Sequence, residues 1–110
     1  MFSHGIVIRT SDDHSIVDID SGSWINPIES IRIDPYVWLC PEVHVLRGVR
    51  VGFGSIIGER SLVTTDVGSC VLAVGVPARA IRERVSWDRS AKPSEGIHKQ
   101  ILMRRTLLDK

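Results

Sequence analysis

The sequence lacks several features that would assign its 110 residues to a special class of protein. It has only two cysteines, Cys40 and Cys70, which we expect to be free thiols rather than part of a disulfide framework. Its net charge of +1 gives no basis for binding nucleic acid or a charged membrane surface. It has no apolar run as long as a membrane span and no signal-peptide pattern at its start. With 43% hydrophobic residues, the sequence predicts one cytoplasmic globular domain.

What the sequence does contain is a six-residue period. Aliphatic residues recur at Ile33, Leu39, Val45, Val51, Ile57 and Val63. Four places after each comes a small or β-branched residue, namely Val37, Val43, Val49, Ser55, Ser61 and Val67. A helix requires apolar spacing near 3.6 residues, whereas a fixed period of six is typical of a parallel β-helix. We expect three hexads to close one triangular coil, so that residues eighteen apart stack at about 4.8 Å.

The coil predicted from this period is short. Gly52, Gly54 and Gly58 are expected in turns that need an unusual φ. The hexads supply about two coils, whereas stacked repeats generally need about three to bury a continuous core. Either the chain gains core by forming an oligomer, or it is the C-terminal piece of a longer enzyme.

The segments that flank the repeat give the domain organisation. Residues 6–8 are predicted to be an earlier strand, and residues 15–30 an inserted loop in which Trp24 and Ile25 pack onto another surface. Residues 71–74 read as a strand, 75–79 as a turn and 80–85 as a helical turn. A linker over 91–96 then leads to a helix over 97–108. The expected units are a β-helix over residues 1–86, lacking N-terminal coils, and a linker with a helical tail over 87–110.

Four blocks, in this order and spacing, resemble the hexapeptide acyltransferases. The resemblance covers about residues 3–86, and it is closest to sugar and polysaccharide O-acetyltransferases of the polysialic acid and maltose–galactoside types. The blocks read IRTSDDHSI, INP followed by IRIDPYVWL, GSIIGERSLVTTDV, and VLAVGVPARAIRE. The resemblance implies an all-β, left-handed parallel β-helix that forms a homotrimer. Acetyl-CoA would lie between neighbouring coils, and the acceptor hydroxyl would enter from the other end.

The resemblance also identifies candidate catalytic residues. His14, in the run SDDHS, matches the catalytic histidine, and an imidazole titrates in the range that a general base needs. Asp12 or Asp13 could orient it, as could the backbone, and both aspartates and Trp24 are candidates for binding the acceptor. Trp38 precedes an inward aliphatic and should therefore face outward, where the next subunit and a ligand would cover it. The alternatives are an exposed loop histidine and an interface tryptophan without ligand contact.

Contacts to acetyl-CoA are expected from Pro41, Gly58, Glu59, Ser61, Thr64, Thr65, Pro77, Arg79 and Arg82. Glu59 and Arg60 stand where the family has small residues, and Thr65 stands where it often has lysine. The guanidinium groups of Arg79 and Arg82 could pair with the nucleotide phosphates, although a solvated surface is the alternative.

No metal is expected, because His4, His14 and His44 lack the close spacing of a zinc site. We therefore expect an acetyl-CoA-dependent O-acetyltransferase that acts on a sugar or polysaccharide hydroxyl. The alternative is a truncated or inactive trimeric scaffold.

Overall fold

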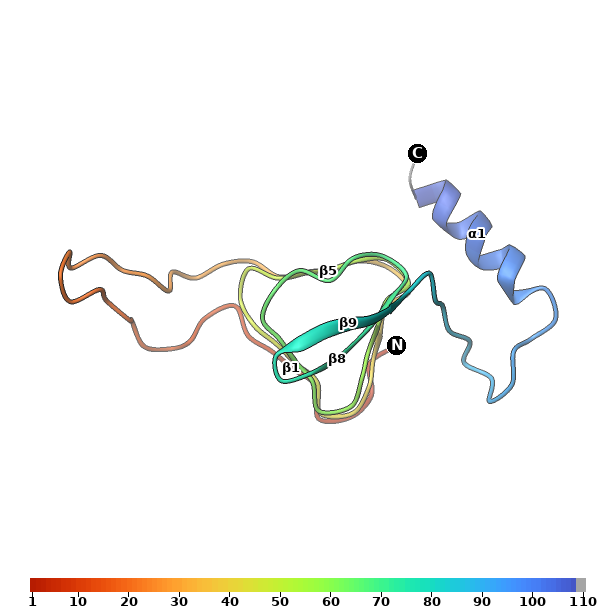
Figure 1. The fold of residues 1–110 in the computed structure, drawn as a ribbon, viewed down its shortest axis with the longest axis horizontal. Helices are drawn as coiled ribbons and strands as arrows, with labels where there is room; N and C mark the ends of the chain where they lie inside the picture. The colour runs from red at the N-terminus through yellow and green to blue at the C-terminus, as the bar shows by residue number, and fades with distance from the viewer. Residues whose placement is uncertain (109–110) are drawn as a thin grey trace.

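The computed structural model describes residues 1–108 and shows a three-sided coil with projections on opposite sides (Figure 1). Each side of the coil is built from two-residue strands separated by turns. These strands are β1 (Val7–Ile8), β2 (Arg32–Ile33), β3 (Trp38–Leu39), β4 (His44–Val45), β5 (Arg50–Val51), β6 (Ile56–Ile57) and β7 (Leu62–Val63).

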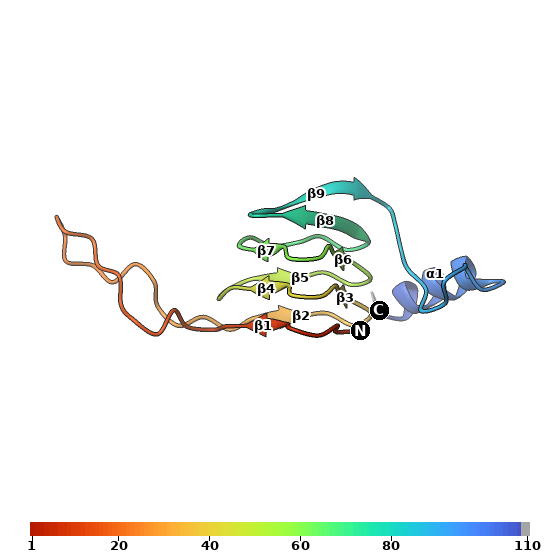
Figure 2. The same ribbon diagram turned by 90° about the horizontal axis from the view of Figure 1, so that it is seen from below.

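The strands stack in parallel on their counterparts one coil away (Figure 2). Val45 pairs with Val63, and Leu39 pairs with Ile57, so partners are eighteen residues apart as the period predicts. Strand β1 pairs with β4, which confirms that residues 6–8 begin an earlier part of the coil. The resulting sheets have the orders β1-β4-β7, β2-β5 and β3-β6-β8-β9.

The core of the coil consists of the residues that the six-residue period selects. Ten of the twelve predicted positions are buried, and the remaining two, Ile33 and Val67, pack against them half-buried. Two of the buried residues are serines, and both are hydrogen-bonded. Ser55 Oγ donates to the Gly52 carbonyl at 2.7 Å, and Ser61 Oγ accepts from the Gly75 amide at 3.0 Å. The narrow interior can thus hold these two small polar side chains, because each hydroxyl has a hydrogen-bond partner.

The turns have a conformational period of their own. After five of the six inward aliphatics, all but Val63, the residue three places on has a positive φ of 60–74°; these residues are Tyr36, Glu42, Gly48, Gly54 and Arg60. Gly54 therefore has the unusual φ that was expected. Gly52 and Gly58 do not have it, and the prediction for them is wrong. Glycine is needed there because a Cβ would lie 2.6 Å from Ser69 N at Gly52 and 2.3 Å from Val74 Cγ1 at Gly58.

The top of the coil is closed by a hairpin of β8 (Val71–Gly75) and β9 (Ala78–Glu83). The helical turn predicted for residues 80–85 is wrong, because β9 pairs antiparallel with β8. A strand here satisfies backbone donors and acceptors of β8 that would otherwise form an open sheet edge. The turn of the hairpin contains a cis Val76–Pro77 peptide bond.

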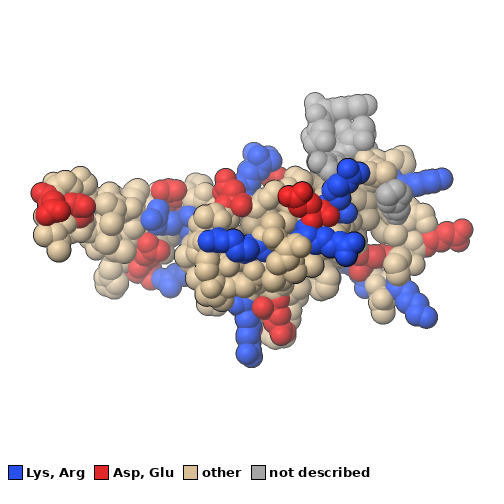
Figure 3. All heavy atoms as spheres, viewed as in Figure 1, with Lys and Arg blue, Asp and Glu red and all other residues tan. Residues whose placement is uncertain are grey.

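Residues 9–31, called the arm below, leave the coil between β1 and β2 and return to it (Figures 1 and 2). An antiparallel bridge joins Val17 to Trp24, and the carboxylate of Asp18 closes the turn at the tip. Trp24 is 54% exposed and Ile25 is 55% exposed, so the expected packing of these side chains is not made within this chain. The end of the arm is acidic, and charges of both signs are interspersed over the rest of this face (Figure 3).

The C-terminal segment leaves the opposite side of the coil and ends in helix α1 (Ile97–Leu108). This helix was predicted, and Ile101 in it is buried; residues 109–110 of the predicted tail lie outside the described residues. No helix among residues 1–108 has the length and apolarity of a membrane span.

One buried carboxylate stabilises the β2–β5 face. Asp34 accepts hydrogen bonds from Arg32 at 2.9 Å and from Arg50 at 2.9 Å, and these two arginines are neighbours across the strand pair. Burial raises the pKa of the Asp34 carboxyl, but the hydrogen bonds and charges of the two arginines lower this pKa by more, so the net shift is downward.

Candidate active site

His14 lies exposed in the arm, close to where the arm leaves the coil. Asp13, with a φ of 69°, precedes it, and the Asp13 carboxylate forms an ion pair with Arg9. The Asp12 carboxylate accepts from Arg47 Nε at 3.2 Å and from the Asn26 side-chain amide at 3.0 Å. The two aspartates that could orient the imidazole are thus engaged with other groups.

The base of the arm is fastened to the coil by Arg47, which follows β4. Its guanidinium bonds to Asp12, to the Pro27 carbonyl at 3.3 Å and to Glu29 at 3.0 Å. The hydrogen bond from Asn26, followed by that from Arg47, lowers the pKa of the Asp12 carboxyl below its usual value. Asp12 is therefore ionised at neutral pH and serves as an anchor for the arm.

Two of the predicted acetyl-CoA contacts lie beside this anchor. Thr64 and Thr65 are exposed and line a cavity of about 320 Å³ together with Asp12, Glu29 and Arg47. Hydroxyl, carboxylate and guanidinium groups thus share one polar hollow, which suits a hydrogen-bonding ligand.

Trp38 lies on the other side of the molecule, because β3 is on the side away from the arm (Figure 2). It alternates with fully buried Leu39 and faces outward, as the period predicts. Its Nε1 is buried, and among the described residues it has no hydrogen-bond partner. This chain therefore does not bring His14 and Trp38 together.

An apolar hollow of about 550 Å³ adjoins Trp38, lined also by Ile56, Leu72, Trp87 and Pro93 among others. Trp87 is buried; its ring centroid lies 5.8 Å from that of Trp38 and 4.4 Å from that of Tyr36. Its Nε1 donates to the Tyr36 carbonyl at 3.0 Å, and the Tyr36 hydroxyl donates to the Trp87 carbonyl. Trp87 is thus a wall of this hollow that the sequence pattern did not identify, since it lies outside the hexads.

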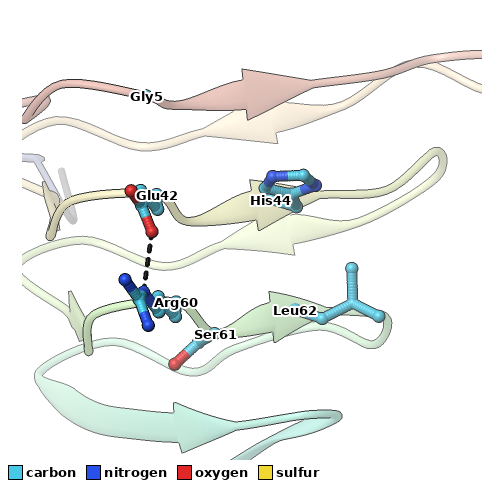
Figure 4. Close-up of a pocket in the computed structure, with 6 residues that line it drawn as sticks. All are labelled: Gly5, Glu42, His44, Arg60, Ser61 and Leu62. Atoms are coloured by element: carbon cyan, nitrogen blue, oxygen red, sulfur yellow. Dashed lines mark hydrogen bonds and ion pairs between the residues drawn. The ribbon is translucent and has the colours of Figure 1, made fainter.

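A third hollow, of about 400 Å³, lies on the β1-β4-β7 face between Gly5, Glu42, His44, Arg60, Ser61 and Leu62 (Figure 4). Arg60 points to Glu42 and forms an ion pair with it at 2.7 Å, so the charge of Arg60 is paired within the chain. The Ser61 hydroxyl is bonded to the β8 backbone. Glu59 is exposed, and Pro41 accepts from the Arg60 amide at 3.0 Å.

The remaining predicted residues lie at the top of the coil. Pro77 is in the hairpin turn, and Arg79 and Arg82 are exposed on β9, where they pair with Val74 and Leu72. Within the part of the chain that the structure describes, no three His, Cys, Asp or Glu side chains are grouped as metal ligands would be.

Comparisons with known proteins point to one group of enzymes, although no family model matches the chain. The polysialic acid O-acetyltransferase of Escherichia coli O1:K1 / APEC is 42% identical over 92 residues, which is 84% of this chain and 30% of that protein. A probable acetyltransferase of Mycobacterium tuberculosis is 35% identical over 85 residues, which is 72% of this chain and 27% of that protein.

Solved structures agree with the sequence relatives. The crystal structure of the polySia-specific acetyltransferase NeuO superposes with a TM-score of 0.84 at 39% identity, over 92% of this chain and 44% of that one. Galactoside acetyltransferase in complex with coenzyme A gives a TM-score of 0.61 at 27% identity, over 82% of this chain and 48% of that one. The chain thus spans less than half the length of each of these relatives.

Proposed function

Because the chain belongs to the hexapeptide-repeat acetyltransferases, we propose that it transfers an acetyl group from acetyl-CoA to a hydroxyl of a sugar or polysaccharide. The names of its relatives support the sugar or polysaccharide acceptor, and an acidic polysaccharide such as polysialic acid is the first acceptor to test. The rival function, a scaffold without activity, has less support, since these relatives are named as acetyltransferases.

The observation that carries this proposal is the buried, unpaired Nε1 of Trp38 beside an apolar hollow. An indole N–H can only donate, and burying a donor without a partner costs about 1–3 kcal/mol. A ligand oxygen that accepts from this nitrogen would remove the penalty. The thioester carbonyl of acetyl-CoA is such an oxygen, and it gains negative charge as the hydroxyl attacks.

The proposed assembly is a homotrimer of left-handed coils. His14 and Trp38 lie on opposite sides of one chain, so a reaction that uses both requires a neighbouring copy. The arm of one copy would reach the Trp38 face of the next. Ile19 at 96% exposure and Trp24 at 54% are consistent with an arm that a neighbour covers.

The reaction would proceed by direct transfer. The His14 imidazole accepts the proton of the acceptor hydroxyl while the hydroxyl oxygen attacks the thioester carbon. Trp38 Nε1 donates to the resulting oxyanion, and the protonated imidazole returns its proton as the CoA thiolate leaves. Cys40 is unsuited to form an acyl-enzyme, because burial and the charge of Glu59 raise the pKa of its thiol.

We assign the binding of acetyl-CoA to the last part of the coil, from β7 to the hairpin of β8 and β9. Arg79 and Arg82 are exposed on β9, where they could pair with the nucleotide phosphates. Thr64 and Thr65 offer hydroxyls in the polar hollow beside Asp12. Arg60 stands where the family has a small residue. Because Arg60 forms an ion pair with Glu42, it adds little net charge to the surface that acetyl-CoA would contact.

The test is release of CoA thiol from acetyl-CoA by the purified protein, with oligosialic acid and neutral oligosaccharides as acceptors. We expect His14→Ala to lower kcat by about a hundredfold or more, because general base catalysis contributes that much. Light scattering should show the same assembly for both proteins. A wild-type protein that assembles but has no turnover with any acceptor would leave the scaffold as the function. His14→Ala with wild-type kcat would exclude His14 as the base.

A further inference from the structure

Asn26 is the most fully bonded side chain in the arm. It is only 5% exposed, although the arm around it is largely exposed. Its Oδ1 accepts from the Ile16 amide at 2.6 Å and from Trp24 Nε1 at 2.8 Å. Its Nδ2 donates to the His14 carbonyl at 2.9 Å and to Asp12 Oδ2 at 3.0 Å. A carboxamide has two acceptor sites and two donor hydrogens, so its hydrogen-bonding capacity is fully used.

The partners of Asn26 fix the orientation of its amide. An amide N–H and an indole N–H can only donate, and a backbone carbonyl and an ionised carboxylate can only accept. Exchanging the oxygen and nitrogen of Asn26 would therefore make all four contacts unfavourable. A substitution that replaces the NH2 group of Asn26 with an oxygen must therefore break both hydrogen bonds that the NH2 group donates.

These bonds connect His14 to the rigid coil. The Asp12 oxygen that accepts from Asn26 also accepts from Arg47 Nε, and Arg47 lies two residues after the end of β4. The path therefore runs from the coil through Arg47, Asp12 and Asn26 to the His14 backbone. Through this path, side-chain hydrogen bonds link the backbone of His14 to the coil.

We propose that Asn26 is a positioning residue, which fixes the backbone of His14 relative to the coil and so sets the place of the imidazole. This inference rests on the proposed function, in which His14 is the catalytic base. The lowered pKa of Asp12 agrees with it, since Asn26 and Arg47 both favour the ionised carboxylate. Misplacing a catalytic group by about 1 Å can reduce the rate about a hundredfold.

The test is Asn26→Asp in the full-length protein, with acetyl-CoA and the acceptor that the wild-type protein uses. The new carboxylate keeps an acceptor for Ile16 and Trp24, but it sets an anionic oxygen against Asp12 and the His14 carbonyl. We expect kcat to fall tenfold to a hundredfold while KM for acetyl-CoA changes much less, because Asn26 does not line the hollow that holds Thr64 and Thr65. Loss of general folding would instead lower the active fraction and the melting temperature.

Asp18→Ala is the matched control. Asp18 also bonds three groups in the arm, the amides of Asp20 and Ser21 and the Ser21 hydroxyl, but it does so at the tip. We expect its kcat to stay within twofold of wild type. Equal losses of kcat in both variants would overturn the inference, because they would report the order of the whole arm rather than the placement of His14.

Two further results separate the possible failures. If His14→Ala is inactive but folded Asn26→Asp keeps kcat within twofold, the inference fails and the proposed function stands. If His14→Ala is active, the proposed base is wrong and the inference falls with it. Should Asn26→Asp not fold, hydrogen exchange of the wild-type protein decides. We expect slow exchange of the Ile16 amide, and exchange at the rate of an unfolded peptide would overturn the inference.

Discussion

Replacing Trp38 with phenylalanine should separate stability from activity. The substitution removes a buried Nε1 that has no partner in the described structure, which relieves a penalty of about 1–3 kcal/mol. It also leaves a smaller ring beside Ile56 and Leu72, and the cavity should cost about 1–2 kcal/mol. The two effects oppose each other. We expect the free energy of unfolding to change by about 1 kcal/mol or less.

The effect of the same substitution on turnover should be large. Removing one donor to a developing oxyanion typically lowers kcat by about a hundredfold to a thousandfold. The assay is thiol release at saturating acetyl-CoA and acceptor, measured beside urea unfolding followed by circular dichroism. A Trp38→Phe protein with wild-type kcat would refute the assignment of Nε1 to the ligand.

Trp87→Phe is the control for stability. It removes the same indole atoms as Trp38→Phe, but the nitrogen that is lost has a hydrogen-bond partner. The substitution removes the hydrogen bond from Trp87 Nε1 to the Tyr36 carbonyl, and we expect a destabilisation of about 1–3 kcal/mol. If Trp38→Phe is destabilised as much as Trp87→Phe, then Nε1 of Trp38 also has a structural partner in the assembled protein. The reasoning from an unpaired donor would then be wrong.

Two further predictions concern the coil. Gly52→Ala should lower the free energy of unfolding by about 2–4 kcal/mol, as severe overpacking does, because its Cβ would lie 2.6 Å from the backbone nitrogen of Ser69. Gly68→Ala is the control, because its Cβ would make an ordinary 3.6 Å contact and should change the free energy of unfolding little. Thermal unfolding of both variants measures the difference, and equal losses of stability would contradict the steric argument. Because the pKa of Asp34 is lowered on folding, its contribution to stability should be complete above its usual pKa of 3.8 and disappear as the pH falls through the lower, folded value. The difference in unfolding free energy between wild type and Asp34→Asn should therefore shrink below about pH 4, and a constant difference down to pH 2 would exclude this linkage.

The sequence was informative wherever a single local rule governs the structure. Inward side chains recur every six residues because each hexad supplies one side of the coil, so the core could be predicted residue by residue. From Tyr36 to Arg60 the positive φ values recur with the same period, yet three of these five residues are not glycine. Composition therefore did not identify the turns. Two of the three glycines that were assigned to turns are instead required by the close approach of the next coil.

Prediction failed where a distant segment decides the local structure. Residues 80–85 have a helix-compatible composition, but the unpaired edge of β8 makes a strand the better solution for β9. Trp87 could not be assigned because its partner, Tyr36, is 51 residues away and no period connects them. The candidate site therefore combines a predictable scaffold with side chains whose roles depend on long-range contacts.

Asn26 shows why such roles are hard to find in a sequence. In a loop with Asp18, Ser21 and Pro27, an asparagine is a common turn former, and nothing in its immediate neighbours distinguishes it. Its importance follows from four partners at separations of 2 to 14 residues, which meet only because the arm folds back on itself. In the coil, the stacking of the repeats fixes each side chain, whereas a projecting arm needs its own hydrogen bonds to fix one point. If His14 is the base, that fixed point has to lie within hydrogen-bonding reach of its backbone, and among the described side chains Asn26 is the one that meets this condition.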